Sequence, residues 1–131
     1  MPVNKSLFTI PVHGGSLTCA RWETTGAPIA IALHGITASH MAWDHLASHL
    51  GESFDLIAPD LRGRGGSLTL PPPYGLSAHA EDIISLADSL ESEQPMIIGH
   101  SLGAYIAVEF AARYPDRASR LVLIDGGIGL P

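Results

Sequence analysis

Residues 95–104 constrain the fold of this chain more than any other segment. A short apolar run is followed by Gly99-His100-Ser101-Leu102-Gly103, and an alanine-rich helical pattern begins directly afterwards. A strand that passes this abruptly into a helix must turn sharply, and the turn leaves the Ser101 hydroxyl at the carboxyl end of the strand. The segment therefore predicts a serine held on a sharp turn at one edge of a sheet.

The two glycines of this segment support the same interpretation. Ser101 is expected in a strained backbone conformation, which a residue other than glycine avoids unless its surroundings enforce it. Gly99 and Gly103 flank Ser101 because side chains at these positions would collide across the turn. The pattern Gly-x-Ser-x-Gly between a strand and a helix is typical of a nucleophile elbow, and this context favours it over a solvent-exposed Gly/Ser turn.

Hydrophobic patterns elsewhere predict strands that alternate with helices. Two alternating runs, 6–12 and 16–22, are separated by His13-Gly14-Gly15 and predict a β-hairpin. Further strands are expected at residues 29–33, 54–59, 96–99 and 121–124, and helices at 40–50, 77–91 and 102–114. This order predicts one α/β domain: a mostly parallel sheet with an N-terminal hairpin and flanking helices.

Composition and charge exclude several classes of function. The 131 residues carry a net charge of -6, which argues against a nucleic-acid-binding surface and against an anionic membrane surface. No signal peptide or membrane-spanning segment is predicted, because Pro2 and Pro11 interrupt the N-terminal apolar residues. Cys19 is the only cysteine, so no internal disulfide forms, and we expect a buried thiol in a cytoplasmic protein.

Residues 60–67 and the pair of His45 and His49 contain partial patterns of cofactor, RNA or metal sites. In residues 60–67, Gly63-x-Gly65 resembles the start of a dinucleotide fingerprint, but Leu68 stands where the third glycine belongs. A single Arg-Gly-Gly copy in an acidic chain is weak evidence for RNA binding, so we expect a structured loop in which Asp60 and Arg62 hold the backbone. His45 and His49 are four residues apart without a further ligand at metal-binding spacing, which favours solvent-facing helix residues. No cofactor and no metal are predicted.

Three segments in their order along the chain resemble the α/β-hydrolase superfamily. They are His34-Gly35 after a strand, Asp60-Leu61-Arg62-Gly63-x-Gly65-x-Ser67, and Gly99-His100-Ser101-Leu102-Gly103, and residues 121–125 resemble the sixth strand of that fold. The resemblance runs from about Ser6 to Gly127 and is to the branch of esterases, enol-lactonases, C–C bond hydrolases and cofactor-free haloperoxidases. A serine nucleophile argues against the epoxide hydrolases and dehalogenases of the superfamily, which use Asp.

The resemblance implies acyl transfer to water from a small ester, lactone or related carbonyl substrate. Ser101 is then the nucleophile, and the backbone N–H groups of Leu102 and Ile36 form the oxyanion hole. His34 and Gly35 belong to the substrate-binding loop, where His34 shapes the turn. Asp125, at the end of the sixth strand, is a candidate for the catalytic acid, although an Asp there is also common without a catalytic role.

The chain departs from the family pattern because its triad is incomplete. Triad order in this fold is Ser, acid, His, and no histidine follows His100. His100 itself should point away from the Ser101 hydroxyl, and the other histidines are expected on surface helices, on the hairpin or in the oxyanion loop. The chain therefore resembles the N-terminal part of a single α/β-hydrolase core domain, truncated after the sixth strand, without the cap, the last two strands and the catalytic histidine.

Two hypotheses remain open for its function. The first is a serine hydrolase that is inactive as residues 1–131 alone and is completed by a C-terminal fragment of the same protein or by self-association. The second is a non-catalytic binding or assembly module that retains the first half of the fold. The intact Gly-x-Ser-x-Gly and His-Gly segments favour the first, because a binding module has no need for a strained serine.

Overall fold

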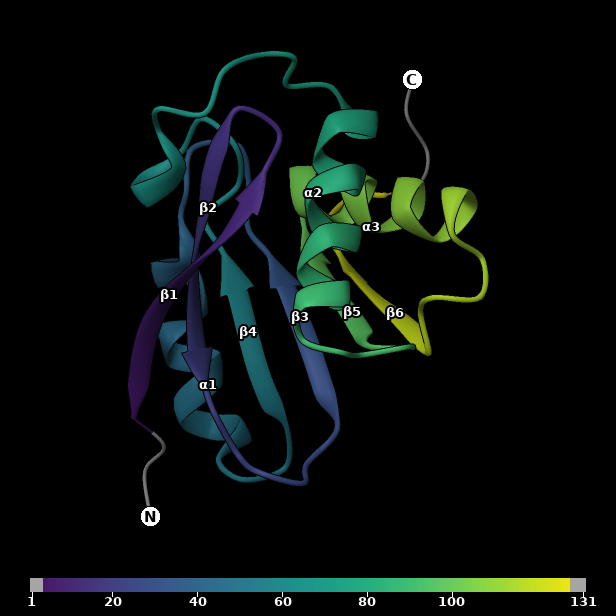
Figure 1. Cartoon of the computed structure of the whole chain (residues 1–131). Helices are drawn as coiled ribbons and strands as arrows, with labels where there is room; N and C mark the ends of the chain where they lie inside the picture. Colours follow the sequence, from purple (N-terminus) through teal and green to yellow (C-terminus); the bar gives the residue numbers. More distant parts are fainter. Residues whose placement is uncertain (1–3, 128–131) are drawn as a thin grey trace.

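A single mixed sheet runs through the computed structural model, which describes residues 4–127. Its strand order is β1-β2-β4-β3-β5-β6 (Figure 1). The strands are β1 (Lys5–Val12), β2 (Gly15–Trp22), β3 (Ile29–Leu33), β4 (Asp55–Pro59), β5 (Met96–His100) and β6 (Arg120–Ile124). β1 and β2 form the predicted antiparallel hairpin, β2 joins β4 antiparallel, and the remaining neighbours are parallel. The predicted α/β class is confirmed.

Helices cover both faces of the sheet. α2 (Leu76–Ser89) and α3 (Leu102–Arg113) pack on one face, and the 3₁₀ turn η1 (His40–Trp43) with α1 (Asp44–Leu50) packs on the other (Figure 1). Alternate residues of β3 enter the two cores, with Ile31 and Leu33 facing α2 and α3, and Ala30 and Ala32 facing α1. The continuous apolar run of β3 is thus explained by burial on both faces.

Two predicted helix starts are wrong. The segment predicted as one helix from residue 40 begins with the 3₁₀ turn η1. Because a 3₁₀ turn winds more tightly than an α-helix, its side chains point in other directions. Met41 is therefore 63% exposed, although it was predicted among the apolar positions of the helix. The next helix begins at Leu76 with Gly75 at its cap position, two residues before the predicted Ser77 cap. The Ser77 hydroxyl instead accepts a hydrogen bond from Arg113 at 2.7 Å, a partner 36 residues away.

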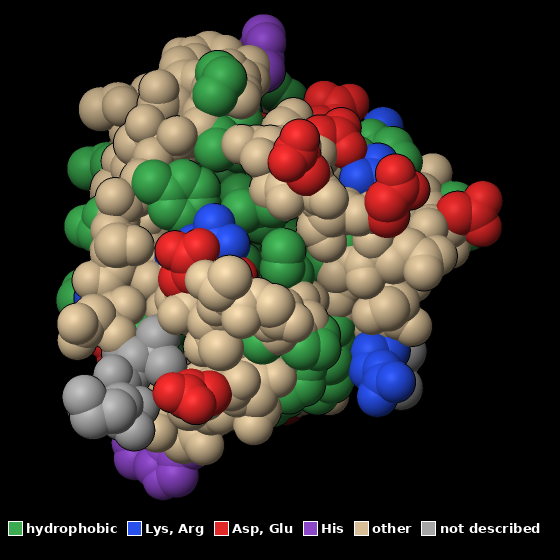
Figure 2. Space-filling view, turned by 60° about the horizontal axis from the view of Figure 1, so that its bottom comes forward, with side chains coloured by type: hydrophobic (Ala, Val, Ile, Leu, Met, Phe, Trp, Pro, Cys, Tyr) green, Lys and Arg blue, Asp and Glu red, His purple; other side chains and the backbone are tan. Residues whose placement is uncertain are grey.

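The α1 side of the sheet is incompletely covered near β6. β6 is an edge strand of the described sheet, and its Val122 and Ile124 side chains are 40% and 43% exposed. At the other end of the strands, Pro28, Ile29, Phe54 and Met96 line a hollow. Figure 2 views the molecule from below relative to Figure 1 and shows hydrophobic side chains gathered on this end. Within residues 4–127, no helix has the length and apolarity needed to cross a membrane.

Candidate active site

Ser101 lies between β5 and α3 in the strained conformation that its motif predicts. Its φ is 54° and its ψ is -116°, and its hydroxyl does not cap the helix that it precedes. The backbone is held from both sides, because the Ser101 N–H donates to the Ile124 carbonyl at 2.9 Å and its carbonyl accepts the Ala104 N–H at 2.9 Å. Positive φ at a residue other than glycine persists only where the surroundings over-determine it, as these bonds do.

The two glycines of the elbow are required by packing. A Cβ at Gly99 would overlap the Gly103 carbonyl, and a Cβ at Gly103 would overlap the Leu33 carbonyl. α3 therefore lies directly against β3 and β5, and the elbow presents Ser101 at the carboxyl edge of the sheet.

The His34-Gly35 loop lies against this elbow. A Cβ placed on Gly35 would stand 3.6 Å from the Ser101 Cβ and 3.4 Å from Nδ1 of His100. The loop turns through Ile36, with the Ala38 N–H donating to the Gly35 carbonyl at 3.1 Å. Among residues 4–127, neither the Ile36 nor the Leu102 amide donates a hydrogen bond to another backbone group.

The His34 side chain shapes the loop from inside the protein. It is fully buried, and its Nε2 accepts the Leu61 N–H at 2.9 Å, which places the proton on Nδ1. Nδ1 donates to the Gly35 carbonyl at 2.7 Å. Burial is the main cause that lowers the pKa of His34, so the imidazole is neutral. With both nitrogens engaged, His34 positions the loop, and any contact with substrate is left to the backbone.

Asp60 joins the start of η1 to the loop that follows β4 and contains Gly63, Gly65 and Gly66. Its Oδ1 accepts the His40 backbone N–H at 2.6 Å and the His40 Nδ1–H at 2.9 Å, and its Oδ2 accepts the Gly66 N–H at 2.9 Å. The predicted role of Asp60 in holding backbone is confirmed. His40, which the sequence places on a helix surface, is instead 9% exposed.

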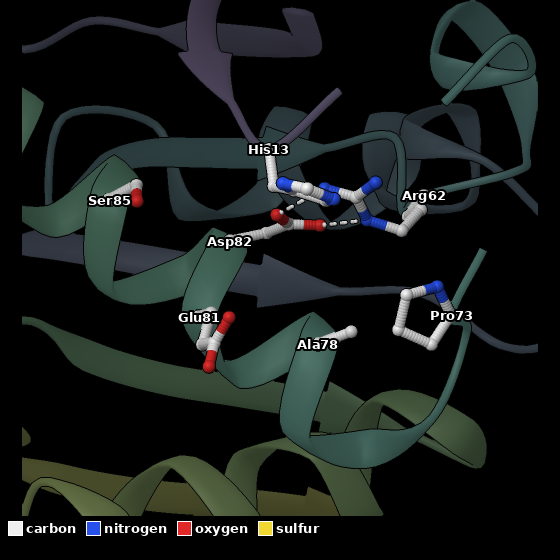
Figure 3. A pocket seen from close by; sticks show the side chains of 7 residues that line it. All are labelled: His13, Arg62, Pro73, Ala78, Glu81, Asp82 and Ser85. Carbon is white, nitrogen blue, oxygen red and sulfur yellow. Dashed lines mark hydrogen bonds and ion pairs between the residues drawn. The ribbon is translucent and has the colours of Figure 1, made fainter. Parts of the chain in front are cut away.

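Arg62 fulfils its predicted role through a buried ion pair. Its Nε and Nη2 donate to the two oxygens of Asp82 in α2 at 2.9 and 2.8 Å, and its Nη1 donates to the Pro71 carbonyl at 3.0 Å. The bond to Asp82 is the main cause that raises the pKa of Arg62. Figure 3 shows this pair in a cavity of about 160 Å³ that His13, Pro73, Ala78, Glu81 and Ser85 also line. The pair fastens the loop after β4 to α2.

Arg64 is a residue of this site that the sequence does not single out. Its Nε donates to the Ile36 carbonyl at 3.1 Å, so it contacts the loop beside Ser101. Its Nη1 donates to the Arg62 carbonyl at 2.9 Å and lies 3.4 Å from Nε2 of His79. His79 was expected on a surface helix but is fully buried in α2, and burial, followed by the charges of Arg64 and Arg62, lowers its pKa to about 4.

Asp125 follows β6 in the register that brings it beside the elbow. His100 of β5 pairs with Ile124 of β6, and these are the last residues of the two strands. Ser101 and Asp125 directly follow them. Asp125 has a φ of 53° and is exposed, which makes it the second strained residue at this edge. Its carboxylate makes no hydrogen bond within the described part of the chain.

No imidazole is hydrogen-bonded to Ser101 within residues 4–127. His45 and His49 are exposed on α1, as predicted, and their tilted rings contact each other with centroids 4.4 Å apart. His100 is exposed and lines a hollow of about 270 Å³ with Ala42, Trp43 and Ile124.

In the described part of the chain, no three His, Cys, Asp or Glu side chains form a metal-ligand group. Cys19 is buried, and burial raises the pKa of its thiol to about 12.

Comparison with known proteins identifies the family. The family model of the alpha/beta hydrolase fold matches residues 29–131, and the chain belongs to this family. It is 35% identical over 111 residues to 2-(acetamidomethylene)succinate hydrolase of Mesorhizobium japonicum, covering 85% of this chain and 40% of that protein. It is 38% identical over 102 residues to N-formylmaleamate deformylase of Pseudomonas putida, covering 77% and 38%.

A solved structure agrees with these relatives. Cfl2 of Burkholderia cenocepacia superposes with a TM-score of 0.88 at 27% identity, covering 97% of this chain and 44% of that one. The chain thus spans less than half the length of each of these three proteins. The relatives support a hydrolase, as the resemblance of the sequence implies.

Proposed function

We propose that this chain carries the nucleophile and oxyanion hole of a serine hydrolase that transfers an acyl group to water. The observation that supports this most is the strained Ser101 beside the amides of Ile36 and Leu102. Strain at one half-buried serine, enforced by bonds on both sides, is a feature of catalytic sites. Leu102 also opens α3, so its amide lies at the positive end of the helix dipole.

In the proposed mechanism, the Ser101 Oγ attacks the carbonyl carbon of the substrate while a histidine takes the hydroxyl proton. The tetrahedral oxyanion accepts hydrogen bonds from the Ile36 and Leu102 amides, each contributing about 3–4 kcal/mol to lowering the barrier. Collapse of this intermediate expels the leaving group and forms an acyl-serine, which water then hydrolyses. Asp125 is the candidate acid that orients the histidine.

The histidine is proposed to come from polypeptide other than this copy of residues 1–131. This fits the greater length of the relatives and the seven histidines of the chain, none of which is bonded to Ser101 in the described residues. A C-terminal part of the same protein or a second copy of the chain would supply it. We place the protein in the cytoplasm on the basis of its single, buried, free cysteine.

The proposed substrate is a small ester, lactone or related carbonyl compound, with no cofactor. Two relatives act on small compounds with an acyl group on nitrogen, 2-(acetamidomethylene)succinate and N-formylmaleamate, so amides belong to the same range. A serine nucleophile with an oxyanion hole serves all of these substrates, because each forms a tetrahedral oxyanion.

Covalent labelling tests the proposal in the protein expressed from its complete reading frame. A fluorophosphonate should label Ser101, as located by peptide mass mapping, and Ser101→Ala should abolish both labelling and turnover of short-chain aryl esters. Ser92→Ala, which changes a hydroxyl beyond the end of α2, is the matched control and should leave labelling intact. Failure to label, or labelling at another residue, would favour the non-catalytic binding or assembly module.

A further inference from the structure

Arg64 carries a charge that no carboxylate of the described structure neutralises. The chain has seven Lys and Arg side chains, and five of them form ion pairs with Asp or Glu: Lys5, Arg21, Arg62, Arg113 and Arg117. Arg64 and Arg120 form no such pair among residues 4–127. Arg120 begins β6 at the opposite end of the sheet, whereas Arg64 contacts the loop beside Ser101.

Backbone carbonyls fix the position of the Arg64 guanidinium. Nε binds the Ile36 carbonyl and Nη1 binds the Arg62 carbonyl, while Nη2 makes no hydrogen bond within the described residues. The guanidinium is therefore held in place by neutral acceptors, with two N–H groups left over. Ile36 is next to Gly35, where an added Cβ would stand 3.6 Å from the Ser101 Cβ, so this fixed cation contacts the loop that packs against the proposed nucleophile.

No neighbouring titratable group among residues 4–127 forms an ion pair with Arg64. His79 and His34 are neutral because burial lowers the pKa of both. Asp82 is engaged with Arg62, and both oxygens of Asp60 accept hydrogen bonds from His40 and Gly66. Both free N–H groups are on Nη2, and one of them can donate a charge-assisted hydrogen bond to an oxygen of a carboxylate.

We propose that Arg64 binds a carboxylate of the substrate, and that the substrate class is therefore a small acyl compound that carries a free carboxylate. The inference rests on the proposed function, because it places this carboxylate relative to Ser101 as nucleophile. The carboxylate accepts a hydrogen bond from Nη2, and the acyl group of the same molecule reaches Ser101. In a protein with a net charge of -6, one fixed cation at the site selects for an anion that the rest of the surface repels.

Two methyl esters of equal acyl-chain length test this proposal with the protein expressed from its complete reading frame. Monomethyl succinate has a terminal carboxylate where methyl butyrate has a methyl group, and acid release is followed by titration. We expect Arg64→Gln to lower kcat/KM for monomethyl succinate at least about tenfold more than for methyl butyrate. Arg64→Lys should retain part of the preference, because it keeps the charge but cannot make the hydrogen bonds of Nε and Nη1 that fix the guanidinium. Arg120→Gln removes the same charge far from the site and should leave the ratio of the two esters unchanged.

A binding measurement separates substrate recognition from loop positioning. Succinate should slow fluorophosphonate labelling of Ser101 in the parent protein, and the concentration needed should rise at least about tenfold in Arg64→Gln. Equal losses for both esters in a folded Arg64→Gln variant, with unchanged protection by succinate, would overturn the proposal and leave Arg64 as a positioning residue. Turnover of both esters by Ser101→Ala at the parent rate would instead overturn the proposed function itself.

Discussion

At the scale of single residues, the amide of Ile36 offers a sharp test of the oxyanion hole. Ile36 is the second residue of the turn closed by the bond from Ala38 to Gly35, a position that accepts proline. Ile36→Pro therefore removes the N–H while the turn is retained, and should lower kcat at least about a hundredfold with a smaller change in substrate binding. Ile36→Ala keeps the amide and is the control for the lost side chain. An unchanged kcat in a folded Ile36→Pro variant would place the oxyanion hole elsewhere.

His79 gives the folded state a defined dependence on pH. Its pKa is lowered from 6.5 to about 4 in the folded protein, so between these values the unfolded chain binds more protons than the folded one. The stability contributed by a neutral His79 is complete above pH 6.5 and is lost as the pH falls towards 4, by up to about 3 kcal/mol.

Urea unfolding at pH 7.5 and pH 4.5 measures this contribution in the protein from the complete reading frame. The fall in the free energy of unfolding between the two pH values should be smaller in His79→Gln than in the parent. His45→Gln is the matched control, because His45 is exposed on α1, and it should keep the parent's pH dependence. A pH dependence in His79→Gln equal to that of the parent would contradict the role assigned to His79.

At the scale of the elements, the contact of α3 with β3 depends on the absence of a side chain at Gly103. A Cβ there would overlap the Leu33 backbone, which cannot move without breaking the sheet. Gly103→Ala should therefore cost more than about 3 kcal/mol in the free energy of unfolding and abolish labelling of Ser101. Gly75→Ala, where a Cβ would meet open space at the start of α2, should change stability by less than about 1 kcal/mol. Similar costs for the two variants in denaturant titrations would show that α3 can shift away from β3.

Local patterns were sufficient to predict most elements and the elbow. The parallel strands are short apolar runs because they are buried on both faces. Ser101 could be recognised in the sequence because the sharp turn that holds it requires glycines on both sides. The start of η1 was missed because a 3₁₀ turn and an α-helix share similar residues but differ in winding. Within the candidate site, the elbow could be predicted because Gly99, Ser101 and Gly103 are close together in the sequence.

Long-range contacts account for what the sequence did not predict. His40 and His79 are buried, and their rings contact Asp60 and Arg64, which lie 20 and 15 residues away in the sequence. Arg64 contacts Ile36 across 28 residues, and neither residue type carries a signal of this contact. Only the fold brings them together, so the spacing of residues along one chain could not reveal them.

At the scale of the whole molecule, the two cores differ in completeness. α2 and α3 cover one face, but on the α1 side the exposed Val122 and Ile124 of β6 lie beside an unpaired strand edge in the described sheet. Such an edge next to apolar side chains is a template for pairing with another chain. We therefore expect residues 1–131, expressed alone, to self-associate, aggregate or be only marginally folded.

Sedimentation and calorimetry of this isolated chain test the expectation. Val122→Lys places a charge on the exposed face of β6 and should reduce self-association. Asp116→Asn, on a loop before β6, changes the net charge by the same amount and is the control for charge alone. The isolated chain should also label weakly at Ser101, because a serine hydroxyl without a histidine base is a poor nucleophile. A monodisperse monomer that melts cooperatively would contradict the hypothesis that residues 1–131 are an incomplete part of a serine hydrolase. Efficient labelling of Ser101 in that monomer would mean that one of the seven histidines of the chain acts as the base.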